Sequence, residues 1–219
     1  MGDRAGGIAV LDALIAIAPW NNEAFLRRGY LKQDSGALDD ALSDFNHTIE
    51  LEHSHLIGFP ARGALLFDLG KLRESLADFR RLPDMVPRPD SSFKESMHLR
   101  IWLIRTRLGE GTEAVKELQG YLANRPSAAA QDWMLAVMRF AVGELGEAEL
   151  LASVPGRAAA TGSEPACVAH YYVGAKHLLA GEQAVAIDHI TTCVATARRD
   201  VDEIRSAEAE LARLSQPRK

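Results

Sequence analysis

Histidine and cysteine are the residue types in this 219-residue chain whose grouping could bind a metal ion. His47, His53 and His55 lie close together, but His53 and His55 fall in a predicted turn. The sequence around them lacks the paired Cys or His spacing of tetrahedral zinc sites. We therefore expect no metal site in this group.

A second group combines Cys167 and Cys193 with His170, His177 and His189. Cys167 begins one predicted helix and Cys193 lies late in the next, antiparallel helix, so their Cβ atoms could come together. In a cytoplasmic protein both thiols would stay reduced and fill the core, whereas a disulfide would need an exported context. Zinc held by the two cysteines and one histidine is the third alternative, but no Cys-x-x-Cys pair supports it. We predict neither a metal ion nor another cofactor.

The sequence carries no motif that predicts catalysis. It lacks a Gly-x-Ser-x-Gly nucleophile elbow, a Gly-rich phosphate loop ending in Lys-Ser or Lys-Thr, and a His-Glu-x-x-His pair. Acidic pairs such as Asp39 with Asp40 and Glu147 with Glu149 fall at predicted exposed helix positions, where solvated carboxylates are the expected state. We predict a protein that is not an enzyme.

The composition favours a helical protein without nucleic acid as a partner. The chain is 47% hydrophobic and 25% charged, and its net charge of −5 creates no field that attracts phosphate backbones. The longest apolar stretch near the start, residues 8–19, is interrupted by Asp12 and is too short to span a bilayer. The start does not resemble a secretory signal, which predicts a cytoplasmic location, or a periplasmic one if an export signal was removed.

The chain repeats itself with a period of 34 residues. The aligned pairs are Phe25 with Phe59, Arg28-Gly29 with Arg62-Gly63, Gly36 with Gly70, Leu38 with Leu72, Leu42 with Leu76, and Asp44-Phe45 with Asp78-Phe79. An aromatic residue four positions before a small one, a glycine between two helices and a small residue five positions further on are typical of the tetratricopeptide repeat (TPR). The chain therefore resembles TPR proteins.

The same glycine-to-alanine spacing extends the resemblance along the chain, at Gly109 with Ala114, Gly143 with Ala148, and Gly181 with Ala186. An all-α fold is implied, a right-handed TPR α-α superhelix with a concave inner face. We expect a single solenoid over residues 1–219, with an inserted loop from Pro83 to Ser92. Its predicted parts are a half-repeat at 8–19, repeats at about 22–55, 56–89, 95–128, 129–162 and 167–200, and a capping helix at 201–215.

Each predicted repeat uses small residues where its two helices meet, and two of the repeats are predicted to have an ion pair between their helices. The glycines between the helices are expected to adopt positive φ. Other small residues are expected to let neighbouring helices approach closely, namely Gly29, Gly63, Ala136 and Gly174 in the first helices and Ala41, Ser75, Ala114, Ala148 and Ala186 in the second helices. Arg28 with Asp44, and Arg62 with Asp78, predict two structural ion pairs, the alternative being an anion clamp in the groove.

The concave face is the predicted binding surface. In the TPR register its exposed positions are Leu26, Tyr30, Gln33, Ala64, Phe67, Leu99, Leu103, Arg107, Trp133, Val137, Phe140, Tyr171, Ala175 and Leu178. Exposed aromatic and arginine side chains there would anchor a peptide. The alternative for each residue is packing against the neighbouring helix.

The second half of the chain is similar to the NlpI-like branch of TPR adaptor proteins. The resemblance spans about residues 95–215 and rests on Trp102-Leu103, the segment from Trp133 to Gly146, the segment from Cys167 to Gly174, Cys193, and the terminal run from Ala209 to Leu214. It implies a non-enzymatic adaptor, and the chain has no lipobox cysteine near its start. The partner does not follow from the resemblance.

The sequence thus predicts an interaction scaffold that binds a partner peptide or protein on its concave face. A module that forms homodimers or larger homo-oligomers is the first alternative, and a TPR accessory domain of a larger enzyme is the second. The identity of the partner, the native start of the chain and the pairing of Cys167 with Cys193 stay open at this point.

Overall fold

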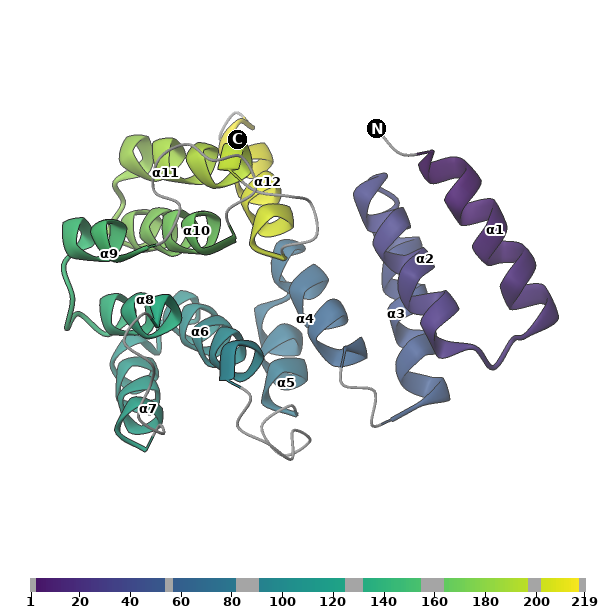
Figure 1. Ribbon diagram of the computed structural model, residues 1–219, viewed down its shortest axis with the longest axis horizontal. Coiled ribbons are helices and arrows are strands. Elements are labelled where there is room, and N and C mark those ends of the chain that lie inside the picture. Colours follow the sequence, from purple (N-terminus) through teal and green to yellow (C-terminus); the bar gives the residue numbers. More distant parts are fainter. Residues whose placement is uncertain are drawn as a thin grey trace. The chain divides into compact units, whose positions relative to one another are not determined.

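The computed structural model describes residues 3–53, 57–81, 91–124, 132–154, 164–196 and 202–216. Within these ranges the regular elements are α-helices, as the sequence predicts (Figure 1). The chain divides into two compact units, Met1–Pro89 and Asp90–Lys219, and each is described by itself. His55 and most of the predicted inserted loop lie outside the described residues, while the last two residues of that loop begin a helix.

Unit 1 consists of helices that each pack against the next one in sequence, as neighbouring ribbons in Figure 1. In its described part these are α1 (Arg4–Ile17), α2 (Asn22–Asp34), α3 (Leu38–Leu51), α4 (Gly58–Asp68) and α5 (Leu72–Arg80). The core cluster between α2, α3 and α4 consists of Leu26, Ala41, Phe45, Ala61 and Leu65. Removing these apolar side chains from water is the main stabilising contribution to the unit.

Five glycines terminate the first helix of a repeat, and all five have positive φ, as predicted. They are Gly36, Gly70, Gly109, Gly143 and Gly181, with φ between 76° and 86°. At the first of them the amide of Ala37 donates to the carbonyl of Lys32 over 2.9 Å, and Gly36 donates to Gln33 over 3.0 Å. This closing pattern satisfies carbonyls at the helix end and requires the left-handed backbone that glycine adopts without strain.

The predicted close approach of paired helices occurs at Gly29 and Gly174. A Cβ atom on Gly29 would lie 2.6 Å from the ring of Phe45, and one on Gly174 would lie 2.7 Å from Ile190 Cγ1. Neither position has room for a side chain. The side chain of the second helix, Phe45 in one repeat and Ile190 in the other, therefore packs directly on the backbone of the first helix.

The two predicted structural ion pairs are present in unit 1. Arg28 and Arg62 each donate from Nε and from a terminal nitrogen to one carboxylate, Asp44 and Asp78 respectively, over 2.7 to 2.9 Å. The remaining nitrogen of Arg62 donates to Asn46 on the preceding second helix, and that of Arg28 donates to Asp12 on α1. Both contacts span 16 residues, so Asp12 of α1 contacts α2 as Asn46 of α3 contacts α4.

Unit 2 continues the pattern of antiparallel helix pairs and ends with an additional helix that packs on the last pair. Its described helices are α6 (Ser91–Arg107), α7 (Gly111–Ala123), α8 (Trp133–Ala141), α9 (Glu147–Ser153), α10 (Glu164–Leu179), α11 (Gln183–Thr196) and α12 (Asp202–Leu214). No described helix is both long enough and apolar enough to cross a membrane.

A buried arginine connects three helices of unit 2. The guanidinium of Arg100 in α6 donates to Ser206 over 3.0 Å and to Glu203 over 3.4 Å, both in α12. It also lies over the ring of Tyr171 in α10, 5.3 Å from the ring centroid. Burial raises the pKa of Glu203, against the opposing effect of Arg100. The buried side of α12 thus carries polar residues, Glu203, Ser206 and Glu210, beside Ile204 and Ala207.

The fourth repeat departs from the predicted register. α9 begins four residues after Gly143, whereas α3, α5, α7 and α11 begin two residues after their glycines. The predicted close packing of Ala148 is therefore wrong, because Ala148 is exposed and Leu150 is buried in its place. Because α9 starts later, the side chain of Glu149 caps its N-terminus. The carboxylate of Glu149 accepts a hydrogen bond of 3.0 Å from the amide of Gly146.

Candidate functional site

Most of the predicted concave-face residues are buried. The expected exposure is wrong for seven residues with large side chains, none of which is more than 6% exposed: Leu26, Phe67, Leu99, Leu103, Val137, Phe140 and Tyr171. Ala64 and Ala175 are buried as well. These side chains contribute to the hydrophobic core, which is the alternative that the sequence left open for each of them.

The burial has a physical reason in each unit. Leu26 belongs to the core cluster of unit 1, where it packs together with residues of α3 and α4. In unit 2, α6 packs against α8 and α10, so the inner positions of these helices face one another. The ammonium of Lys176 lies 4.4 Å from the ring centroid of Phe140 and covers it. Large apolar side chains at these positions are more stable against a neighbouring helix than in water.

The predicted concave-face residues that keep partial exposure are Tyr30, Gln33, Arg107, Trp133 and Leu178. Tyr30 packs edge-on against Phe45, with ring centroids 5.3 Å apart. The guanidinium of Arg107 forms an ion pair with Glu210 of α12. A peptide-binding role for these positions stays a prediction.

The most exposed apolar surface in the described part of the chain lies on and beside α1. Val10 is 69% exposed, Ile17 is 77% exposed, and Trp20, in the turn after α1, is 73% exposed. Leu14 lies on the same side of the helix, between Val10 and Ile17, and is also exposed. We call Val10, Leu14, Ile17 and Trp20 the α1 apolar face.

The α1 apolar face arises because α1 is apolar around most of its circumference. Its partly buried residues Ile8, Leu11 and Ile15 follow helical spacing on one side, and Val10, Leu14 and Ile17 follow it on the other. α1 packs against α2, which lies beside it in Figure 1. A helix with two apolar sides is suited to binding a second helix.

The two cysteines differ from the reduced state expected of a cytoplasmic protein. Cys167 and Cys193 are completely buried, as predicted for core residues, but they are joined as a disulfide. Their Cα atoms are only 4.0 Å apart because α10 and α11 approach closely along their length. A zinc site that uses both sulfur atoms is therefore incompatible with this state.

The histidines predicted to share one segment do come together. His170 and His189 have their Nδ1 atoms 3.0 Å apart, and His177 and His189 stack with ring centroids separated by 5.7 Å. Their partner is Glu147, which was predicted to lie on a solvated helix face and whose role no sequence motif indicates. The late start of α9, which positions Glu147, leaves no signal in the repeat spacing.

The three histidines differ in the direction of their pKa shifts. Burial lowers the pKa of His189, more than the carboxylate of Glu147 raises it. Burial and then the neighbouring His189 lower the pKa of His170. Burial also acts to lower the pKa of His177, but hydrogen bonds to Glu182 and Glu147 raise it above its ordinary value. His170 and His189 therefore present neutral imidazoles at neutral pH.

Comparisons with known proteins show the fold. Neither the family models nor the curated proteins give a match. Among solved structures, a tetratricopeptide repeat protein from Parabacteroides merdae ATCC 43184 superimposes with a TM-score of 0.55 at 16% identity, covering 96% of this chain and 78% of that one. The crystal structure of MamA gives a TM-score of 0.50 at 13% identity, covering 98% of this chain and 93% of that one. These similarities confirm the predicted all-α helical-repeat fold of TPR proteins.

Proposed function

We propose that this protein is an interaction scaffold whose α1 apolar face binds an amphipathic helix of a partner protein. The exposure of Val10, Ile17 and Trp20 carries the proposal. Water contact with several large apolar side chains in one patch is unfavourable, and such patches mark interaction surfaces. The adaptor activity implied by the NlpI-like resemblance is of the same class.

The position of α1 in the repeat supports a helix as the bound element. Val10 and Leu14 stand 34 residues before Asp44 and Thr48 of α3. Those two α3 residues are buried and face α2, since Asp44 accepts from Arg28, and Thr48 Oγ1 lies 3.4 Å from the carbonyl oxygen of Asn22. The α1 apolar face therefore corresponds to the side of α3 on which a paired helix packs.

The residue types at these positions indicate the chemistry of the partner helix. On the side of α3 that faces α2, Asp44 accepts hydrogen bonds from Arg28, and Thr48 contacts the backbone of α2. α1 presents a valine and a leucine, so its partner requires apolar residues at i, i+3 and i+4. Burial of such apolar side chains stabilises a complex by about 25 cal/mol for each Å² of apolar surface removed from water.

Site-specific crosslinking tests the proposal. A photoreactive amino acid is placed at Ile17 and, as a matched control, at Val185, an exposed apolar residue of α11. In lysate of the source cell we expect crosslinks from position 17 to a helical segment of another protein, and their loss when Val10→Glu is added. Crosslinking from position 17 that does not exceed position 185, or that survives Val10→Glu, contradicts the proposal.

Self-association is distinguished by the same experiment. If the α1 apolar face pairs with a second copy, position 17 crosslinks to this chain itself and the mass in light scattering rises with concentration. That result would favour the homo-oligomeric alternative. The concave-face prediction is tested in parallel with Tyr30→Ala and Trp133→Ala, which leave the α1 apolar face intact.

A further inference from the structure

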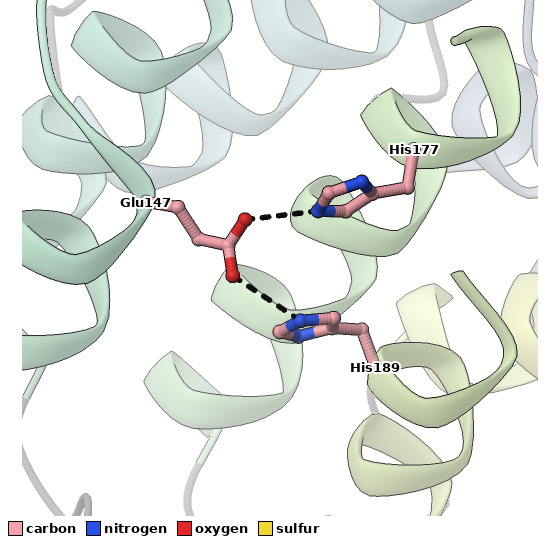
Figure 2. A group of neighbouring side chains, drawn as sticks. All are labelled: Glu147, His177 and His189. Carbon is pink, nitrogen blue, oxygen red and sulfur yellow. Dashed lines mark hydrogen bonds and ion pairs between the residues drawn. The ribbon is translucent and has the colours of Figure 1, made fainter. Parts of the chain in front are cut away.

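Three side chains from successive helices of unit 2 meet at one point near the surface. Figure 2 shows Glu147 from the start of α9 between His177 of α10 and His189 of α11. One carboxylate oxygen lies 2.9 Å from Nε2 of His177, and the other lies 3.3 Å from Nε2 of His189. One ligand atom from each residue can be chosen so that all three lie within 4.8 Å of one another.

We propose that Glu147, His177 and His189 form a binding site for a divalent transition-metal ion of the zinc type. Two imidazole nitrogens and one carboxylate oxygen are donors that Zn²⁺, Co²⁺ and Ni²⁺ accept readily. Mg²⁺ and Ca²⁺ prefer oxygen ligands alone and would not select this set. Three protein ligands leave a fourth tetrahedral position for water or for a group from a partner.

The second nitrogen of each histidine already has a hydrogen-bond partner, as metal-ligating histidines require. His177 Nδ1 contacts the carboxylate of Glu182, and His189 Nδ1 lies 3.0 Å from Nδ1 of His170. Such contacts fix the ring orientation and the tautomer and leave Nε2 for the ion. Both Nε2 atoms face Glu147, so a bound ion needs only a small movement of these three side chains.

Two of the other repeats have an ion pair at the pair of positions that His177 and His189 occupy. His177 and His189 stand four residues before and eight residues after the repeat glycine, Gly181. The first repeat places Lys32 and Asp44 at these positions, and they form an ion pair of 2.9 Å. The third repeat places Arg105 and Glu117 there, and they also form an ion pair.

Two histidines cannot replace such a pair by mutual attraction. An ion pair supplies both charges, whereas His177 and His189 supply none of opposite sign, and each instead contacts one oxygen of Glu147. A metal ion would be coordinated by all three side chains in place of these contacts. The two histidines thus stand at positions where paired helices contact each other in other repeats. Both side chains are therefore held by rigid helices.

The site is accessible and has a structural consequence. The side chains of His177, His189 and Glu147 are 20%, 15% and 38% exposed, so an ion can enter from solvent. α9 is a seven-residue helix with Leu150 as its buried residue. Metal binding through Glu147 would connect α9 to α10 and α11 and stabilise the fourth repeat against the fifth.

Calorimetric titration of tag-free protein with ZnCl₂ tests the proposal, and Co²⁺ serves as a spectroscopic probe. We expect one equivalent of Zn²⁺ to bind, a raised Tm, and visible Co²⁺ absorption of a four-coordinate site. Glu147→Gln, His177→Gln and His189→Gln should each weaken binding by about 100-fold, and Glu182→Gln by about 10-fold. His47→Gln in unit 1 is the matched control and should bind as the wild type does.

Circular dichroism of each variant establishes that loss of binding is not loss of folding. The proposal is overturned if folded wild-type protein binds no Zn²⁺. It is also overturned if the Glu147→Gln, His177→Gln and His189→Gln variants bind Zn²⁺ as tightly as wild type, since binding would then involve other histidines. The crosslinking at Ile17 is independent of this result, because the two sites lie in different units.

Discussion

Arg28 and Asp44 are joined by two parallel hydrogen bonds, from Nε over 2.9 Å and from a terminal nitrogen over 2.7 Å. Arg62 and Asp78 repeat the same arrangement in the next repeat. Both carboxylates are buried, and each guanidinium uses two of its nitrogens to hold the second helix of its repeat to the first. The alternative that these arginines form an anion clamp has no support in this geometry.

The two ion pairs should differ in their sensitivity to loss of the arginine. Asp44 has a second cation, Lys32, at 2.9 Å, whereas Leu66 stands at the equivalent position near Asp78. Arg62→Met therefore leaves a buried carboxylate without compensation and should lower the free energy of unfolding by about 3 kcal/mol. Arg28→Met should cost about 1 to 2 kcal/mol. Urea denaturation followed by circular dichroism measures both, and equal losses would contradict the role given to Lys32.

Two glycines of unit 2 should respond to alanine with opposite signs. A Cβ on Gly174 would lie 3.1 Å from the carbonyl oxygen of Ala186, which is backbone and cannot move aside. Gly174→Ala should destabilise by about 2 kcal/mol or more. Gly120 lies inside α7 with nothing within 4 Å of the added atom, so Gly120→Ala should stabilise by about 0.5 to 1 kcal/mol. A stabilised Gly174→Ala variant would show that α10 and α11 are not in close contact.

His98 should make the stability of unit 2 depend on pH. Burial and then the charge of Lys94 lower the pKa of His98 to about 4, from 6.5 in the unfolded chain. As pH falls, the unfolded state takes up the proton first. Stability that is fully present above about pH 6.5 is therefore lost progressively toward pH 4, by about 1 to 2 kcal/mol after allowance for solvent screening.

The pKa of His98 can be measured directly by NMR titration of its ring protons. His98→Phe keeps an aromatic ring against Tyr121, whose centroid lies 3.8 Å from that of His98, and should remove this part of the pH dependence. His47→Gln, in unit 1, serves as the control and should leave it unchanged. A measured pKa near 6.5 for His98 would refute the prediction.

The disulfide should stabilise unit 2 in a way that reduction reverses. Cys167 and Cys193 are separated by 26 residues, and closing a loop of this length contributes about 3 kcal/mol. A reducing agent should lower the urea midpoint of the wild type but not that of a Cys167→Ala, Cys193→Ala variant. Alkylation of both thiols in unreduced, denatured protein would show that the bond is absent and would disprove this prediction.

The framework of the fold could be predicted from local sequence. Gly36 and Gly70 specify the turns because only glycine adopts positive φ without strain, and this requirement depends on no distant residue. Arg28 and Asp44 could be paired from their repetition at Arg62 and Asp78, since equivalent positions have equivalent surroundings. The period of 34 residues thus specified the helix pairs, and solved TPR structures confirm the fold.

The surface could not be predicted in the same way. Repeat register indicates which side of a helix a residue occupies, but the packing of neighbouring helices decides whether that side reaches solvent. Leu99 and Leu103 were expected in a groove and are buried in unit 2, whereas Ile17 was assigned to a half-repeat and is exposed. Register alone does not show whether a residue is buried or exposed, because exposure depends on residues far away in sequence.

The sequence by itself determined the helices, their turns and their internal ion pairs, because each depends on residues within one repeat or its copy 34 positions away. Only the tertiary structure decided that Glu147 meets His177 and His189. That meeting requires α9 to begin two residues late and to turn one carboxylate toward the next repeat. Metal coordination depends on distances between side chains in three dimensions. The repeat period fixes where a residue stands along the chain but not which side chains of other helices lie next to it.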